Sequence, residues 1–179
     1  MKLFLGIIFL FSFVFGDEFT LTQQQYQEIQ QNGYTMIRNL ENKSGTIVFD
    51  IAEDKNIVMQ KILNFQHYPQ NIEDVSKIEI YEKNAQTIKA HIFIDTFFIG
   101  FDNYVIHKID KKNYKVSWHL DSSKENYFAQ MQGYWKLQSI ENKTRVFYHN
   151  KLSFKSWIPE FIESYLFEKG LFKSTQWIR

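Results

Sequence analysis

The chain has 179 residues, a length that suits one domain with a core of ordinary size. Its net charge of +1 at pH 7 gives no sign of a nucleic-acid partner, and we expect none. The absence of cysteine excludes disulfides, thiolate metal sites and cysteine nucleophiles. Aromatic residues make up 18% of the chain, which predicts a bulky core or an aromatic-lined pocket.

The first residues have the pattern of a signal peptide. Lys2 precedes an apolar run from Leu3 to Phe15, which is well short of the roughly 20 residues that a membrane-spanning helix needs. Gly16 is small enough for the position before a cleavage site at Asp17. We therefore predict that residues 1–16 are a cleaved signal peptide and that the protein is exported, either to the periplasm or out of the cell. An uncleaved membrane anchor is the alternative.

Residues 17–44 are expected to form an N-terminal helix and an arm. Thr22, with a glutamine three residues later, has the pattern of a capping box, and Asn32-Gly33 is a typical helix end. The apolar stripe of this helix is thin, so we expect it on the outside of the molecule. Tyr34 to Leu40 is interpreted as an extended arm.

Residues 45–179 are predicted to form one ligand-binding domain. A strand over 46–51 leads into a helix over 55–65, which Asp54 caps and which stops before Pro69. Strands joined by short connections follow, which indicates an antiparallel meander. About six such strands are expected by this pattern reading. They cover residues 77–82, 86–96, 99–109, 114–120, 126–138 and 144–154.

Alternation along these strands predicts one inward, largely apolar face. Gly133 on this face favours close approach of another backbone or sharp curvature of the sheet. The inward positions expected are Ile88, Ala90, Ile92 and Ile94, then Phe101, Asn103, Val105 and His107, then Val116 and Trp118, then Tyr127, Ala129, Met131, Trp135 and Leu137, and finally Val146 and Tyr148.

A long helix is predicted at the end of the chain. Pro159 suits its first turn, and apolar residues from Ile158 to Leu166 recur at helical spacing. A helix that is apolar around so much of its circumference must be largely covered. A bent sheet wrapped around it would provide that cover, giving an α+β protein. Gly170 inside this helix suggests a packing or access requirement.

The order of these elements resembles the START-like, or SRPBCC (helix-grip), superfamily. The segments that carry the resemblance are Ile47 to Ala52, Ile62 to Pro69, Gly133 to Leu137 and Trp157 to Pro159. The superfamily includes StAR-related lipid-transfer domains, polyketide cyclases/dehydrases and coenzyme Q-binding proteins. The resemblance implies a curved antiparallel sheet wrapped around a long C-terminal helix. It does not fix the activity, because this fold hosts binding proteins and enzymes alike.

The inward aromatic residues predict a cavity that binds a hydrophobic small molecule, such as a lipid or isoprenoid, without catalysis. We expect no cofactor and no metal, since no histidine pair has a metal-ligand spacing. The protein is expected to act as a monomer. The predicted lining residues are Phe101, His107, Trp118, Tyr127, Met131, Trp135 and Tyr148 from the sheet, and Phe161, Ile162 and Tyr165 from the helix.

Two other functions stay open at this stage. A cyclase or dehydratase acting on an apolar polyketide-like substrate would need a base at the pocket, for which His107, Tyr127 and Tyr148 are candidates. An interaction module without a ligand would have a filled core, with no cavity reaching about 300 Å³, the low end for ligand sites. Aromatic residues near the helix ends could also make transient contact with a membrane. These are Trp157, Ile158, Phe167 and Trp177.

Overall fold

The structure is a computed structural model that describes residues 20–39, 41–96 and 99–179. Within these ranges, the side chains of residues 96, 99, 160 and 162–166 lie outside the description. The predicted signal peptide, residues 1–16, also lies outside the described residues. No helix in the described ranges is both long enough and apolar enough to cross a membrane.

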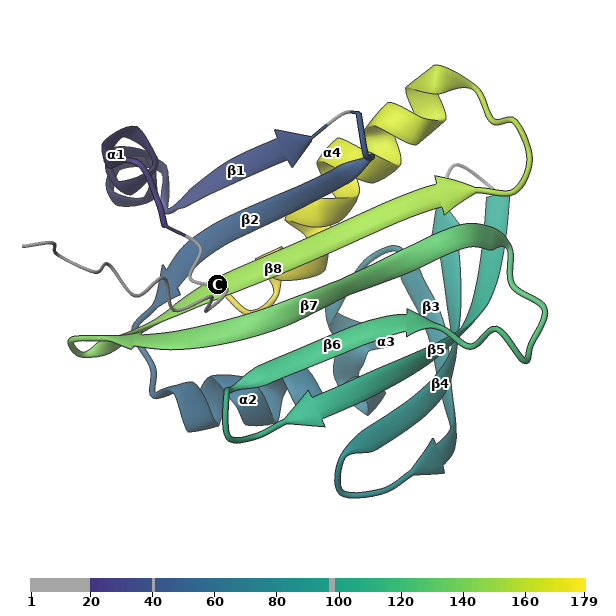
Figure 1. The fold of residues 1–179 in the computed structure, drawn as a ribbon, viewed down its shortest axis with the longest axis horizontal. Coiled ribbons are helices and arrows are strands. Elements are labelled where there is room, and N and C mark those ends of the chain that lie inside the picture. The colour runs from purple at the N-terminus through teal and green to yellow at the C-terminus, as the bar shows by residue number, and fades with distance from the viewer. Residues whose placement is uncertain (1–19, 40, 97–98) are drawn as a thin grey trace, which may run out of the picture.

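An antiparallel sheet of eight strands forms the body of the molecule (Figure 1). Strands β3 to β8 follow one another as the predicted meander, and β2 closes onto β8, with β1 at the edge. The bounds are β1 Tyr34–Asn39, β2 Ser44–Ile51, β3 Val75–Lys83, β4 Thr87–Thr96, β5 Ile99–Asp110, β6 Lys115–Leu120, β7 Phe128–Ile140 and β8 Lys143–Phe154.

The N-terminal segment is built largely as its sequence predicts. Helix α1 (Gln23–Asn32) has a complete capping box at Thr22 and ends at Gly33, whose φ of 81° suits a residue without a side chain. The expected arm is a strand, β1, which pairs with β2 along its whole length. Alternation was too weak there to reveal a strand, because β1 lies at the sheet edge and buries only Thr35.

The remaining helices lie on the concave face of the sheet (Figure 1). They are α2 (Lys55–Leu63), the one-turn 3₁₀ helix η1 (Phe65–His67), α3 (Tyr68–Asn71) and the terminal helix α4 (Glu160–Gln176). Side chains from α2, α4 and the inward strand positions form the main core. The predicted helix over 55–65 is therefore confirmed up to residue 63, where the chain tightens into η1.

The convex face carries a smaller second core. Leu21 and Ile29 at α1 cover Val48 of β2 and Phe147 of β8, which point away from the main core. The inner face of these two strands is apolar as well, because Ile47 of β2 and Val146 of β8 belong to the main core. Both strands are consequently apolar on both faces. Helix α1 thus lies on the outside of the molecule, as predicted (Figure 1). It covers the convex face of β2 and β8, the two strands that α4 contacts from the concave face.

Close packing on β2 fixes the position of α4. A Cβ atom added at Gly45 would collide with Leu171 and would lie 3.2 Å from Cζ of Phe167. Only a residue without a side chain allows the helix to approach the strand this closely. Gly170, by contrast, has no described atom within 4 Å of such a Cβ, so the packing requirement expected for this glycine is not found.

The inward face of β7 differs from the predicted one at its start. Phe128 is buried, Tyr127 is 38% exposed, and Ala129 is also exposed. A register irregularity between Phe128 and Gln130 reverses the alternation there, and the expected pattern returns toward Trp135. Simple alternation could not reveal this shift, because both Tyr127 and Phe128 are large aromatic residues.

Candidate ligand-binding site

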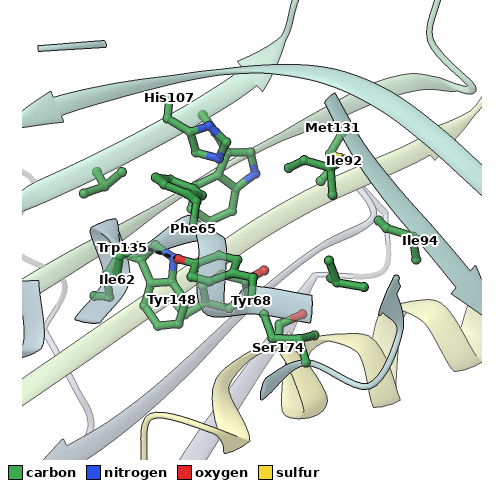
Figure 2. Close-up of a pocket in the computed structure, with 14 residues that line it drawn as sticks. Ile62, Phe65, Tyr68, Ile92, Ile94, His107, Met131, Trp135, Tyr148 and Ser174 are labelled. Carbon is green, nitrogen blue, oxygen red and sulfur yellow. Dashed lines mark hydrogen bonds between the residues drawn. The ribbon is translucent and has the colours of Figure 1, made fainter. Parts of the chain in front are cut away.

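A cavity of about 100 Å³ lies between the concave face of the sheet and the helices (Figure 2). Its wall consists almost entirely of apolar and aromatic side chains. They come from the α2–α3 region, from strands β3 to β8 and from α4. The lining residues are Ile62, Phe65, Tyr68, Ile72, Val75, Ile92, Ile94, His107, Val116, Trp118, Met131, Trp135, Tyr148 and Ser174.

Half of the predicted site residues meet in this cavity. They are the inward side chains near the middle of the sheet, where α4 and the α2–α3 region face it. These residues are His107, Trp118, Met131, Trp135 and Tyr148. The alternation of β5, β6 and β8, and of β7 from Met131 onward, was regular enough to place them.

Of the other predicted residues, Phe101, Tyr127 and Phe161 do not line the cavity. Phe101 is buried in a separate aromatic cluster with Tyr127, Phe128 and Phe154, with ring centroids 4.6 to 6.2 Å from its own. Phe161 is 67% exposed, because the beginning of α4 projects beyond the β1–β2 hairpin (Figure 1). The side chains of Ile162 and Tyr165 lie outside the described residues.

Sequence reasoning missed the contribution of the short helices. Phe65 and Tyr68 bring two aromatic rings into the wall, with centroids 5.1 Å apart. Ile62 and Phe65, three residues apart, were recognisable as an inward helical pair, but nothing in their spacing showed that they face a cavity. Ser174 of α4 was also missed, since its polar side chain interrupts the apolar stripe.

Trp118 is held by its neighbours on two strands. It lies opposite Gly133 of β7, where an added Cβ would lie 2.5 Å from Cζ2 of the indole and would collide with the carbonyl oxygen of His149. The indole also stacks on Tyr148 of β8, with centroids 5.4 Å apart and an interplanar angle of 27°. Gly133 therefore provides the room in which the indole lies against the sheet, which explains a glycine in a strand interior.

His107 of β5 is the one imidazole in the cavity wall among the described residues. Burial lowers its pKa to about 4, while a hydrogen bond with the backbone of Ile88 acts in the opposite direction. The ring is therefore neutral at pH 7. It packs 4.5 Å, centroid to centroid, from Phe65 and lies directly opposite Trp118 in the β5–β6 pairing.

The two tyrosines of the wall are neutral as well. Burial raises the pKa of the Tyr68 phenol, whose hydroxyl donates to the carbonyl oxygen of Ile62 at 2.6 Å. Burial also raises the pKa of Tyr148 to about 12, against a hydrogen bond with Ser174 that lowers it. Tyr148 and Ser174 thus join the sheet to α4 at the cavity.

Two ring nitrogens in the wall have no hydrogen-bond partner within the described part of the chain. They are Nδ1 of His107 and Nε1 of Trp118, and each residue is only 6% exposed. Buried polar groups are normally paired, so two unpaired ones at a single cavity require an explanation. Within the same ranges, no cluster of three His, Asp or Glu side chains could hold a metal ion.

The cavity is smaller than the sequence led us to expect. Its volume of about 100 Å³ is below the roughly 300 Å³ at which ligand sites usually begin. The aromatic rings that were predicted to surround open space occupy much of that space themselves. Side-chain volume can be read from a sequence, but the rotamers that decide how it is arranged cannot.

No protein-family model and no curated protein matches this sequence. Solved structures do match its fold. An aromatase/cyclase from a Streptomyces species has a TM-score of 0.67 at 11% identity, covering 80% of this chain and 92% of its own. A STAR-related lipid transfer protein from Xanthomonas axonopodis has a TM-score of 0.66 at 12% identity, covering 82% and 97%.

A START superfamily protein from Mycobacterium smegmatis is similar too, with a TM-score of 0.62, 10% identity and coverage of 80% of this chain and 93% of its own. Together with the eight-stranded sheet and the terminal helix, these likenesses show that the chain has the START-like, helix-grip α+β fold. At such low identity they establish the fold alone. Ligand binding and cyclase chemistry both fit it.

Proposed function

We propose that this protein binds or carries a hydrophobic small molecule, of the lipid or isoprenoid kind, in the cavity between the sheet and α4, without catalysis. The observation that carries the proposal is the wall itself. It is apolar and aromatic over most of its area, with few polar side chains among its lining residues: His107, Ser174 and the tyrosine hydroxyls. Apolar walls with a few polar groups are the usual composition of small-molecule sites.

The cavity volume limits what binds without rearrangement. An engineered apolar cavity of about 150 Å³ in another protein binds benzene, so about 100 Å³ suits only a small group. A longer ligand therefore requires lining side chains to move. The lining residues that are only partly buried can yield with least loss of packing, and these are Tyr68, Val75, Ile94, Met131 and Ser174.

Competition with an apolar fluorescent probe tests the proposal. Val75→Phe adds bulk at a cavity-lining position, and Ile57→Phe makes a comparable change at a half-exposed position outside the lining. We expect the wild-type protein and Ile57→Phe to bind the probe and to release it to isoprenoid or fatty-alcohol competitors. Val75→Phe should bind it at least about tenfold more weakly, since displaced methylenes cost about 0.8 kcal/mol each.

A cyclase-type reaction on an apolar polyketide-like substrate is the second candidate. It is favoured by His107, whose imidazole is buried in the cavity wall and neutral at pH 7. A general base must lie within hydrogen-bonding reach of the proton that it removes, and a substrate in the cavity would meet this condition. Loss of turnover in His107→Ala, with the fold retained, would establish this function instead.

A module without a ligand is the third candidate, and the small volume by itself favours it. A filled core does not explain the space of about 100 Å³ that remains between the sheet and the helices. Failure of every apolar probe to bind would support this reading against the first one.

We also propose export after cleavage of residues 1–16 and transient contact with a lipid surface. Trp157 is 86% exposed and Phe161 67% exposed, and both lie where α4 begins. Two of the aromatic residues predicted for this contact, Phe167 and Trp177, pack against other parts of the protein. Phe167 approaches β2 at Gly45, and the ring of Trp177 packs 5.4 Å from that of Tyr68.

A further inference from the structure

A second hollow, of about 490 Å³, lies outside the main cavity. It is lined by Asp102 and Tyr104 on the outward side of β5, by residues 125–127 of the β6–β7 connection, and by Lys155 and Ser156 of the β8–α4 connection. Both connections lie at the end of the molecule where β7 and α4 begin (Figure 1). We call this hollow the outer groove.

Hydrogen bonds hold the wall of the outer groove in place. The side chain of Asn126, which is only 8% exposed, accepts from the backbone N–H of Tyr104 at 2.7 Å. Its amide nitrogen donates to the carbonyl oxygens of Asp121 and Lys124, at 2.9 and 3.1 Å. The connection is therefore fixed against β5 before any ligand arrives, which lowers the cost of ordering the site on binding.

Two tyrosine rings lie in this wall. Tyr104 stacks on His91 with ring centroids 3.9 Å apart, and Nζ of Lys124 lies 5.8 Å from the Tyr104 centroid. Tyr127 is 38% exposed, and no lysine or arginine in the described part of the chain lies over its ring. The face of an aromatic ring attracts cations, and quaternary ammonium groups in particular bind to such rings.

Both signs of charge meet in the outer groove. The carboxylates of Asp102 and Glu125 lie on the lining with the tyrosines, and Lys155 lies there with the hydroxyl of Ser156. Asp102 pairs with His91 at 2.8 Å, whereas Glu125 and Lys155 form no ion pair within the described ranges. Carboxylates and tyrosine rings suit a cationic group, and a lysine with a hydroxyl suits a phosphate. A ligand that carries both groups matches this lining better than a ligand with either one.

The outer groove is continuous with the residues that we propose for contact with a lipid surface. Ser156 directly precedes Trp157, which is 86% exposed, and Phe161 follows at 67% exposure. A lipid surface that receives these two aromatic side chains would bring its headgroups to the neighbouring groove. Membrane lipids are therefore the source of ligands that this position favours.

We propose that the outer groove binds the phosphocholine headgroup of a membrane lipid. Its ammonium group lies against Tyr127 and the carboxylates of Asp102 and Glu125, and its phosphate lies at Lys155 and Ser156. This inference rests on the proposed contact with a lipid surface and adds the headgroup that the contact selects. The site is separate from the main cavity.

Co-sedimentation of the full-length protein with two kinds of vesicle tests the proposal. The vesicles consist of phosphatidylcholine or of phosphatidylglycerol with the same acyl chains, so only the first kind carries an ammonium group. We expect Glu125→Gln and Tyr127→Leu each to bind phosphatidylcholine vesicles about threefold more weakly, the size of one exposed contact with a cation. Tyr127→Leu keeps an apolar side chain beside Phe101 and Phe128.

Glu141→Gln is the matched control for Glu125→Gln. It removes the same charge from an exposed glutamate, which lies in the β7–β8 turn at the far end of the molecule (Figure 1). The two glutamine variants should bind phosphatidylglycerol vesicles alike, and only Glu125→Gln should lose affinity for phosphatidylcholine.

The possible failures are distinguishable. If the two glutamine variants bind phosphatidylcholine vesicles alike, the headgroup site is wrong while the lipid contact stands. If neither kind of vesicle binds the wild type, the lipid contact fails and the headgroup site fails with it. Should Tyr127→Leu not fold, the comparison of Glu125→Gln with Glu141→Gln decides alone, because both change an exposed side chain.

Discussion

The indole of Trp118 lies against Gly133 on the neighbouring strand, at a distance that leaves no room for a side chain at that position. This relationship connects the sequence to the site. A glycine in a strand interior is unfavourable in isolation, and here it allows a large ring to lie flat at the cavity wall. The same contact holds the indole of Trp118 in the cavity wall, and its buried Nε1 has no hydrogen-bond partner in the described ranges.

Substituting this glycine should disturb both the fold and the site. We expect Gly133→Ala to lower the free energy of unfolding by about 1–3 kcal/mol, the usual cost of overpacking, because the new Cβ would collide with the carbonyl oxygen of His149 and press on the indole. Urea denaturation measures the loss, and tryptophan fluorescence reports the displaced ring.

Gly170→Ala is the matched control for this change. The added Cβ meets open space among the described residues, and alanine favours the helix, so stability should rise by up to about 1 kcal/mol. Equal effects of the two substitutions would show that the contact between Trp118 and Gly133 has no energetic importance.

Acidification should weaken the fold through His107. Burial holds the pKa of its folded state at about 4, below the ordinary value of 6.5, so the unfolded chain takes up the proton first as the pH falls. The contribution of neutral His107 to the free energy of unfolding is complete above pH 6.5 and is lost progressively down to pH 4. It amounts to at most about 3 kcal/mol.

The variant His107→Gln isolates this effect, because it keeps a polar side chain that does not titrate. Burial lowers the pKa of His149 as well, so both proteins should lose some stability over the same range. Denaturant unfolding at several pH values should show a steeper loss in the wild type. Parallel curves for the two proteins would mean that His107 is not buried in the neutral form.

Exposed aromatic residues at the start of α4 should promote binding to a lipid surface. Burying one large apolar side chain in a membrane interface contributes roughly 1.5–3 kcal/mol, so Trp157→Ser should reduce binding to phosphatidylcholine vesicles by about tenfold or more. Co-sedimentation with vesicles measures this, and Tyr26→Ser, an exposed aromatic position on α1, is the control. If both variants co-sediment with vesicles like the wild type, the exposed aromatic residues at the start of α4 do not contribute to membrane binding.

Much of the architecture could be predicted from alternation and capping. Regular alternation placed Val105 and His107 on the inner face of β5, and the Thr22 capping box fixed the start of α1. Short connections predicted the meander, and the apolar terminal helix predicted a sheet wrapped around it. These features are local, so each follows from a short stretch of sequence.

The parts that could not be predicted depend on contacts distant in the sequence. The irregularity after Phe128 arises from pairing with β8, and the exposure of Phe161 depends on where the sheet ends relative to α4. The contribution of Tyr68 depends on how α3 folds back over the sheet. The cavity volume is the extreme case, because it is the small difference between the space enclosed and the volume of all the rings that fill it.

Native mass spectrometry of the protein purified without detergent tests the central claim most directly. We predict that the wild type and Ile57→Phe carry a bound hydrophobic molecule that organic extraction releases, and that Val75→Phe, altered at the cavity wall, has lost it. Unliganded masses for all three proteins, together with no displacement of an apolar probe by any lipid or isoprenoid, would contradict the claim.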